Sequence, residues 1–280
     1  MKYENYFKNY IQLIEKTLNE ILPQGNQYPN VIHEAMRYAV LHGGKRFRPV
    51  LTLAAAEAAG GKTEDARLAA AGIELIHAYS LVHDDLPALD NDAVRRGNPT
   101  VHKKFGESIA VLTGDGLLTL AFNVLSQISS AEKAVRLIGE ISTAAGSYGM
   151  IGGQVADIES SDRTLSLPML DYINIHKTGK LIKVSAVAGA VMGGASPKGF
   201  QHIAKYGELL GLAFQSIDDM LDGDGYLQLM KIREVRQKVR DLIAQAKREV
   251  RVLGKRSAKL IALANYLLER MPKKVHAKVD

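Results

Sequence analysis

The sequence contains no cysteine among its 280 residues. This absence excludes disulfide bridges, thiolate metal sites and cysteine nucleophiles together. It fits a reducing compartment without proving one. The N-terminus also lacks the basic and then apolar profile of a secretory signal, and no uninterrupted apolar run is long enough to span a bilayer. We therefore expect a cytoplasmic protein that does not insert into a membrane.

Tryptophan is absent too, which bears on the meaning of the net charge of +6. One stretch of the C-terminal third carries much of this charge: Lys231, Arg233, Arg236, Lys238, Arg240, Lys247 and Arg248. Acidic and apolar residues between these cations indicate a solvated helix face, and base-stacking aromatic residues do not alternate with them. Nucleic acid is therefore a poor fit as a partner. Small anionic molecules remain a good fit, because a few convergent cations suffice to bind a phosphate.

Alternating strand patterns are absent, as is any strand followed by a glycine-rich nucleotide loop. Apolar residues instead recur at helical spacing, and proline and glycine punctuate the segments. The predicted helices cover residues 3–22, 29–42, 49–60, 64–86, 107–127, 131–157, 168–193, 198–222, 227–253 and 256–270. Because neither a linker nor a repeat interrupts them, we expect residues 1–280 to form a single all-α domain with long helices around a central cavity.

A first group of carboxylates lies in the segment LVHDDLPALDNDAVRRGNPT, which contains Asp84, Asp85, Asp90 and Asp92. Adjacent acids repel one another unless a cation or hydrogen-bond donors lie between them. Pro87 predicts that the regular helix ends nearby, so that the chain can return Asp90 towards Asp84. A lone pair of aspartates is more often a helix cap or a solvated surface, so this group alone is modest evidence of a site.

A second group lies in the segment FQSIDDMLDGDG, where Asp218 and Asp222 are four residues apart and share one helix face. Carboxylate oxygens suit Mg²⁺, which typically takes one or two of them and completes its shell with phosphate oxygens and water. Two such groups on separate helices, each preceded by buried-looking residues, favour a magnesium site over a solvated surface.

The sequence also contains two sets of basic residues. These are Lys45, Arg46 and Arg48 before the first acidic group, and Arg95 and Arg96 after it. Residues 45–48 or residues 95–96 taken alone are as consistent with ordinary surface charge as with a binding site. Together they provide the guanidinium forks and the ammonium that a diphosphate needs opposite a metal ion. His77 lies two helical turns before Asp84 on the same face. It is either an ordinary core histidine or a donor to a second phosphate group.

Five segments occur in an order that resembles a known family: GGKRFRP, IELIHAYSLVHDDLPALDNDAVRRGNPTVHKKFG, GGQVADI, HKTGKLI and GLAFQSIDDMLD. They are spread over about residues 30–225. The chain resembles the bacterial farnesyl diphosphate synthases within the trans-polyprenyl (isoprenyl) diphosphate synthase family. The resemblance implies the isoprenoid synthase fold, a homodimer, and three Mg²⁺ ions in each active site.

The resemblance also implies a role for individual residues. Asp84 and Asp90 would bind two Mg²⁺ ions beneath an allylic diphosphate, and Asp218 a third. Arg95 and Lys177 would hold the allylic diphosphate, with Gln154 close to the allylic substrate. The residues expected to hold isopentenyl diphosphate are Lys45, Arg48, His77 and Arg96. Thr178 and Gln215 would direct oxygen dipoles at a developing carbocation.

These residues would catalyse a head-to-tail condensation. The allylic diphosphate would ionise, the isopentenyl double bond would attack the cation, and loss of a proton to the released diphosphate would follow. A growing tail would pass Ser80 and Tyr79, and the Tyr79 ring would close the floor of a short tunnel. The resemblance therefore favours farnesyl diphosphate, with fifteen carbons, over geranylgeranyl diphosphate. The alternative is that Tyr79 is simply a core residue.

The chain departs from the family pattern after the second acidic group. The sequence passes from Asp222 through Gly223–Gly225 almost directly to Tyr226, whereas relatives carry a longer loop with a diphosphate-binding lysine. This is either a real deletion, which could cripple catalysis, or a mobile loop omitted from the sequence. The seamless resumption of the pattern favours the omitted loop.

Two other functions fit part of the pattern. A terpene cyclase on the same fold would keep the acidic groups, but it would not need GGKRFRP or His77. A non-catalytic subunit of a heteromeric synthase would have lost acidic groups, and both are present here.

Overall fold

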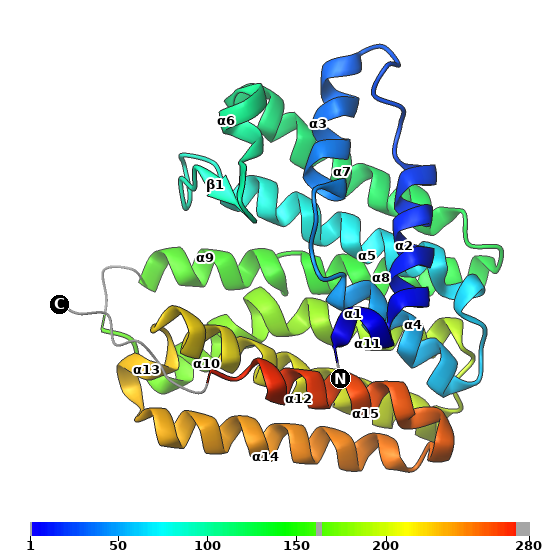
Figure 1. Cartoon of the computed structure of the whole chain (residues 1–280), viewed down its shortest axis with the longest axis vertical. Helices are drawn as coiled ribbons and strands as arrows, with labels where there is room; N and C mark the ends of the chain where they lie inside the picture. The colour runs from blue at the N-terminus through cyan, green and yellow to red at the C-terminus, as the bar shows by residue number, and fades with distance from the viewer. Residues whose placement is uncertain (1, 161–163, 273–280) are drawn as a thin grey trace. The chain divides into compact units, whose positions relative to one another are not determined.

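The computed structural model describes residues 2–160 and 164–272 (Figure 1). The first part of the chain forms α1 (Tyr3–Tyr6), α2 (Lys8–Ile21), α3 (Asn30–Leu41), α4 (Phe47–Ala59), α5 (Thr63–Asp84), β1 (Val94–Arg95), β2 (Asn98–Pro99), α6 (Val101–Phe105), α7 (Glu107–Ser126) and α8 (Ala131–Ala145). The second part forms α9 (Met150–Ser160), α10 (Leu167–Ile173), the π-helix η1 (Asn174–Gly179), α11 (Lys180–Met192), α12 (Pro197–Asp222), α13 (Tyr226–Leu229), α14 (Ile232–Arg251), the 3₁₀ turn η2 (Gly254–Ser257) and α15 (Ala258–Arg270). The predicted all-α class is confirmed.

The chain forms two compact units. Unit 1 contains the residues up to Leu53 together with Thr63–Ile138. Unit 2 contains Ala54–Lys62 and the residues from Gly139 onward. The prediction that the whole chain is a single domain stays a prediction.

Helix α5 is the centre of unit 1. Twelve of the 17 residues from Ala66 to Val82 are buried, because α5 packs against α2, α3 and α7. Gly72 makes part of this packing possible, since a Cβ atom there would lie 3.1 Å from the Leu125 side chain of α7. The acidic residues of the first turn, Glu64 and Asp65, lie at the positive end of the helix dipole. The C-terminal end of α5 carries the first acidic group.

A glycine pair separates α3 from α4, as the sequence predicts. Gly43 and Gly44 have φ angles of +91° and +118°, which side chains with a Cβ rarely adopt. Pro49 then lies in the first turn of α4, where its missing N–H costs no hydrogen bond. This turn brings the basic residues of the GGKRFRP segment next to α5.

Close helix packing organises unit 2, in which α12 packs against α11 and α14. A Cβ atom at Gly207 would lie 2.8 Å from the Ala186 methyl group of α11. One turn later, a Cβ atom at Gly211 would lie 2.9 Å from Gly179 Cα. Ser196 caps the start of α12 by accepting the Gly199 N–H, and Gly223 ends the helix in the left-handed conformation.

Some predicted helix boundaries are wrong. The helix predicted over residues 131–157 is divided into α8 and α9, because the chain turns at Gly146, whose C=O accepts the Gly149 N–H. The helices predicted over 3–22 and 227–253 are each divided as well. No strand was predicted, and β1 and β2 form a short antiparallel hairpin in which Arg95 pairs with Asn98.

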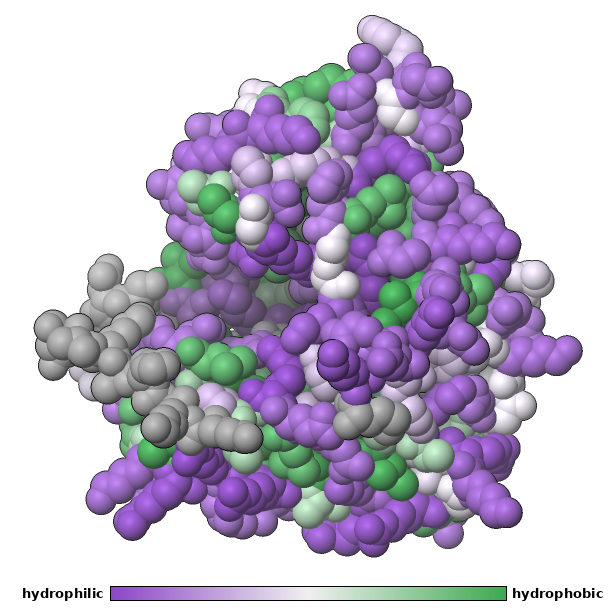
Figure 2. Space-filling model, viewed as in Figure 1, coloured by the Kyte–Doolittle hydropathy of each residue, from purple (hydrophilic) through white to green (hydrophobic). Residues whose placement is uncertain are grey.

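The helix α7 is the one helix among residues 2–160 and 164–272 that is long and apolar enough to cross a membrane by length and composition alone. Of its most apolar window, 39% is buried, and it packs against α3 and α5. Core helices of soluble proteins pass the same test, so this is weak evidence for a membrane span. Figure 2 shows a face on which hydrophilic residues predominate and hydrophobic residues form separate patches.

The glycines of α12 give a test of the packing in unit 2. We expect Gly207→Ala to lower the free energy of unfolding by about 1–3 kcal/mol, because the new methyl group forces α11 and α12 apart. Gly139→Ala is the matched control in α8, where a Cβ atom meets nothing within 4 Å. It should raise the free energy of unfolding by about 0.5–1 kcal/mol through helix propensity. Urea unfolding measures both, and equal effects would contradict the packing argument.

Candidate active site

The first acidic group lies where α5 ends, at Asp84. The Asp90 N–H donates to the Asp84 C=O at 2.9 Å, and the Asn91 N–H donates to the Leu86 C=O at 3.1 Å. The chain therefore turns back on itself after Pro87 and returns Asp90 to Asp84, as the sequence predicts. Asp84 is half-buried and Asp90 is exposed, so carboxylates are presented at the surface of unit 1.

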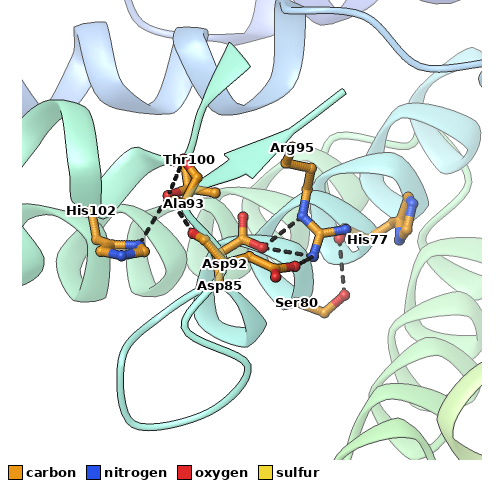
Figure 3. A network of polar contacts seen from close by, with 8 residues as sticks. All are labelled: His77, Ser80, Asp85, Asp92, Ala93, Arg95, Thr100 and His102. Carbon is orange, nitrogen blue, oxygen red and sulfur yellow. Dashed lines mark hydrogen bonds and ion pairs between the residues drawn. The ribbon is translucent and has the colours of Figure 1, made fainter. Parts of the chain in front are cut away.

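The neighbouring carboxylate Asp85 differs from Asp84, because Asp85 is only 3% exposed. Its Oδ1 atom accepts a hydrogen bond of 2.6 Å from Arg95 Nε and lies 2.6 Å from Arg95 Nη2 (Figure 3). Burial raises the pKa of Asp85, while the Arg95 guanidinium acts in the opposite direction. Arg95 Nη2 also donates to Asp92 Oδ2 at 3.2 Å. The two carboxylates thus fix the guanidinium that the resemblance assigns to the allylic diphosphate.

The β1–β2 hairpin carries Arg95 and Arg96, and several hydrogen bonds hold it. The Thr100 hydroxyl donates to the Asp92 C=O at 2.8 Å and lies 3.1 Å from His102 Nδ1 (Figure 3). The Tyr38 hydroxyl of α3 donates to the Pro99 C=O at 2.8 Å. These hydrogen bonds fix the hairpin that carries Arg95 and Arg96. The sequence analysis predicted the two arginines but not the hairpin.

Four of the five predicted basic residues of unit 1 gather around His77. Arg48 Nη1 lies 3.2 Å from His77 Nε2, and Arg96 Nη1 donates to the Gly43 C=O at 2.6 Å. Burial lowers the pKa of His77 well below its ordinary value, and the charges of four nearby arginines lower it further. These arginines are Arg48, Arg96, Arg95 and Arg46. A cluster with this much positive charge is suited to a polyanion.

The residues predicted to limit product length lie one turn before the acidic group. Tyr79 is 5% exposed, and its ring meets the His83 ring edge to face at 5.9 Å. Burial and the nearby charge of Asp84 raise the pKa of Tyr79 to about 12. The Tyr79 hydroxyl has no hydrogen-bond partner among the described residues. The Ser80 hydroxyl donates to the His77 C=O at 2.9 Å.

In unit 2, Lys177 and Thr178 lie in the π-helix η1. Such a π-helical turn is rare and is frequent at functional sites. Lys177 Nζ donates to Asp157 Oδ2 of α9 at 2.7 Å. Gly153 of the same helix allows this approach, because a Cβ atom there would lie 2.2 Å from the Lys177 backbone nitrogen. Gln154 follows on α9 and is half-buried.

The second acidic group divides its paired aspartates between two environments. Asp219 is 6% exposed and accepts hydrogen bonds from Gln215 Nε2 at 2.8 Å and from Asn174 Nδ2 at 3.3 Å. Burial raises the pKa of Asp219 despite these donors. Asp218 instead accepts a hydrogen bond of 3.0 Å from Arg270 Nη2, at the end of α15. Asp222 is the last residue of α12, four residues after Asp218, as predicted.

The connection after Asp222 is a hydrogen-bonded turn. The Tyr226 N–H donates to Asp219 Oδ2 at 3.1 Å, and the Tyr226 hydroxyl donates to Asp171. Lys238 Nζ lies 3.6 Å from the centroid of the Tyr226 ring. The 280-residue chain thus closes this connection without a longer loop.

The donor groups fit magnesium that is shared with a diphosphate. Among residues 2–160 and 164–272, no three histidine or carboxylate side chains are gathered into a metal-binding group. Mg²⁺ needs only one or two carboxylates when phosphate oxygens and water complete its shell. The carboxylates that would hold the ion are those of Asp84 and Asp90 in unit 1 and that of Asp218 in unit 2.

Several residues that support this site were given no role in the sequence analysis. Asp85, Asp157, Asp219 and Arg270 each contact a predicted site residue or its neighbour. The four-residue spacing of Gln215 and Asp219 was the available signal for one of these contacts. The others join residues far apart in the sequence, for which no spacing rule exists.

Comparison with known proteins decides the family. The model of the polyprenyl synthetase family matches residues 29–231. The chain belongs to the polyprenyl synthetase family. Members of this family are trans-prenyltransferases, and the chain's relatives include synthases named for different products.

A large subunit of a heterodimeric geranylgeranyl pyrophosphate synthase from Arabidopsis thaliana, a chloroplast protein, is 46% identical over 77% of this chain. The chain spans only 61% of that relative's length. The farnesyl diphosphate synthase of Geobacillus stearothermophilus is 43% identical over 79% of this chain and 76% of the relative. Chloroplast proteins thus stand beside bacterial ones, so family membership does not fix the compartment.

Among solved structures, an FPP/GFPP synthase from Zymomonas mobilis superposes with a TM-score of 0.90 at 36% identity. The match covers 95% of this chain and 98% of that one. The isoprenoid synthase fold expected from the resemblance is thereby confirmed.

The low pKa of His77 predicts a proton uptake. In the free protein His77 is neutral at pH 7, because burial and the arginine charges hold its pKa below 6.5. A bound polyanion offsets those charges and raises this pKa, so binding takes up protons and strengthens as the pH falls toward 6.5. Calorimetry with inorganic pyrophosphate in two buffers of different ionisation enthalpy measures the uptake. His77→Gln should take up fewer protons than the wild type, and equal uptake would contradict the assignment.

Proposed function

We propose that this protein condenses isopentenyl diphosphate head to tail with dimethylallyl or geranyl diphosphate, giving farnesyl diphosphate and diphosphate. The observation that carries the proposal is the gathering of arginines around His77, whose pKa their charges lower. The same unit also contains Asp84 and Asp90, which a turn brings back together. Unit 1 therefore offers both kinds of group that a reaction of two diphosphates requires.

Isopentenyl diphosphate is the substrate proposed for the basic cluster. Its diphosphate is held by the cations Lys45, Arg48 and Arg96 and by the imidazole of His77. Arg48 and His77 already lie within hydrogen-bonding distance of each other, so both can turn toward one phosphate group. Fixing this diphosphate orients the double bond, and orientation provides a large part of the rate in a bimolecular reaction.

The allylic diphosphate is the proposed leaving group. Asp84, Asp90 and Asp218 hold magnesium, which when bound neutralises the leaving diphosphate as a Lewis acid. Arg95 binds the same diphosphate and is oriented for it by Asp85. Lys177 is assigned the same role by the resemblance, and Asp157 holds its ammonium group.

The developing carbocation needs oxygen dipoles and an absence of water. Gln215 donates its amide N–H to Asp219, which leaves its amide oxygen directed away from that carboxylate. Gln215 and Thr178 are proposed to direct oxygens at the cation. The released diphosphate accepts the proton in the last step, since the resemblance assigns no side-chain base to it.

Product length rests on Tyr79. Its buried ring, one turn before the acidic group, is proposed to close the tunnel floor. The small side chain of Ser80 is proposed to leave space for the growing chain. A geranylgeranyl product is the second candidate, because relatives named for that product are as similar as those named for farnesyl diphosphate.

A homodimer is the proposed assembly. Within unit 1, α7 and α8 present large apolar side chains to solvent, with Val111 42%, Leu112 54% and Val135 71% exposed. A second copy of the chain would bury exposed apolar side chains of this kind. The family resemblance implies the same assembly.

The decisive experiment supplies Mg²⁺, labelled isopentenyl diphosphate and geranyl diphosphate, and identifies the alcohols after dephosphorylation. We expect farnesol, and none when EDTA is present. Asp84→Ala should lower kcat by about 100-fold or more, because it removes charge stabilisation from the leaving group. Asp65→Ala is the control at the other end of α5 and should leave kcat unchanged.

Each other outcome of this assay has a definite meaning. Geranylgeraniol keeps the reaction class and contradicts the proposed product. No condensation by folded protein contradicts the enzyme and leaves the non-catalytic subunit as the function.

Tyr79 variants test the tunnel floor. Tyr79→Ala should shift the products beyond fifteen carbons, because it opens space next to Ser80. Tyr79→Phe should keep farnesyl diphosphate, since the Tyr79 hydroxyl has no partner among the described residues. Chromatography of the product alcohols measures both. The Ala variant should also lose about 3–5 kcal/mol of stability to the cavity, so its folding is checked by thermal denaturation. An unchanged product from folded Tyr79→Ala would make Tyr79 an ordinary core residue.

A further inference from the structure

The segment GGKRFRP contains one cation that is not presented to solvent. Arg46 is 3% exposed, whereas its neighbour Lys45 is exposed and Arg48 is half-buried. We propose that Arg46 is a positioning residue, which fixes residues 43–48 in the shape that presents Lys45 and Arg48 to a diphosphate. This proposal rests on the function proposed above and assigns a role to a residue outside the binding set.

The Arg46 guanidinium joins three helices through one planar group. Nε donates to Glu15 Oε1 of α2 at 2.6 Å, and Nη1 donates to Glu74 Oε1 of α5 at 2.9 Å. Nη2 donates at 2.7 Å to the Val40 C=O, in the last turn of α3. Each of the three guanidinium nitrogens therefore has an acceptor on a different helix. A lysine ammonium lacks this fixed planar fork, so it cannot reproduce the geometry.

The backbone of Arg46 shows why such an anchor is needed. Its φ angle is +51°, a left-handed conformation that costs free energy for a residue with a Cβ. The Arg46 C=O also accepts the Val50 N–H at 3.0 Å, which begins the hydrogen bonding of α4. The direction in which Arg48 leaves the first turn of α4 thus depends on this backbone conformation. The surrounding ion pairs hold the conformation in place.

Two neighbouring contacts connect residues 43–48 to α5. Arg46 contacts Glu74, and Arg48 contacts His77 one turn later on the same helix. The first contact is buried and pairs opposite charges. The second joins an arginine to a histidine whose pKa is lowered by burial and by arginine charges. The first contact therefore aligns the segment, and the second is the one that a bound anion would stabilise.

The glycines of the segment close it around another binding residue. Arg96 donates to the Gly43 C=O at 2.6 Å. A Cβ atom at Gly44 would lie 2.5 Å from Arg96 Nη1. A change in the path of the segment at Arg46 would therefore move Lys45 and Arg48 and also disturb Arg96. All of these groups are proposed to bind isopentenyl diphosphate, and none of them is proposed to bind the allylic substrate.

Steady-state kinetics of Arg46→Lys separates this role from general stability. We expect the KM for isopentenyl diphosphate to rise by about tenfold or more, a factor that corresponds to about 1.4 kcal/mol. The KM for geranyl diphosphate should change by less than about twofold, which is well below the rise expected for isopentenyl diphosphate. Arg67→Lys is the matched control, because Arg67 makes a half-exposed ion pair with Glu20 in the same unit. It should leave both constants unchanged.

A double variant tests whether shape or only charge balance matters. Arg46→Met with Glu74→Met removes both buried charges, so it should recover thermal stability relative to Arg46→Met alone. It should keep the raised KM for isopentenyl diphosphate. If Arg46→Lys does not fold, Glu15→Gln provides a milder change, since Glu15 is 41% exposed and the Arg46–Glu74 pair remains. A smaller rise in the same KM is then expected.

Three outcomes of these kinetic measurements would overturn the proposal. These are an unchanged KM in folded Arg46→Lys, an equal rise for both substrates, and a normal KM in the double variant. Binding of inorganic pyrophosphate without Mg²⁺ separates this proposal from the proposed function. If the wild type does not condense substrates but binds pyrophosphate, Arg46→Lys should still weaken binding by about tenfold. No binding by the wild type, or equal binding by the variant, overturns the role of Arg46.

Discussion

Repulsion between like charges is the constraint on which the candidate site depends. The proposed binding of two diphosphates requires cations around His77 and carboxylates at the C-terminal ends of α5 and α12. Crowded charges raise the free energy of the folded protein unless groups of opposite charge compensate them. The structure places a countercharge at each point: Glu74 against Arg46, Asp85 against Arg95, Asp157 against Lys177 and Arg270 against Asp218.

These countercharges do more than lower repulsion. Each countercharge lies in a different segment from the residue that it contacts. Each pair therefore also fixes the orientation of the side chain that it neutralises. Asp85 holds Arg95 through two nitrogens of one guanidinium, and Arg46 is held from three helices. A site built in this way loses little conformational freedom when a substrate binds, which favours affinity.

Glycine has a second organising role, because it allows backbones to approach where the site is built. Gly153 lets α9 approach the π-helix that carries Lys177 and Thr178, and Gly211 lets α12 approach Gly179 at its end. Gly44 similarly makes room for the Arg96 guanidinium. In each case a methyl group would meet backbone or a charged group, so the glycine is required by packing and not only by flexibility.

Local sequence patterns were enough to predict the helical class, the two acidic groups and the turn that brings Asp90 back to Asp84. These features depend on local spacing and on proline and glycine, whose effects act within a few residues. The resemblance to the family identified the candidate binding residues and was confirmed by comparison. Tertiary contacts decided which member of each close pair is buried. The pairs are Arg46 and Arg48, Asp84 and Asp85, and Asp218 and Asp219, and the two members of each pair have the same chemistry. Residues one or two positions apart point in different directions, and only the helices packed around them determine which one is buried.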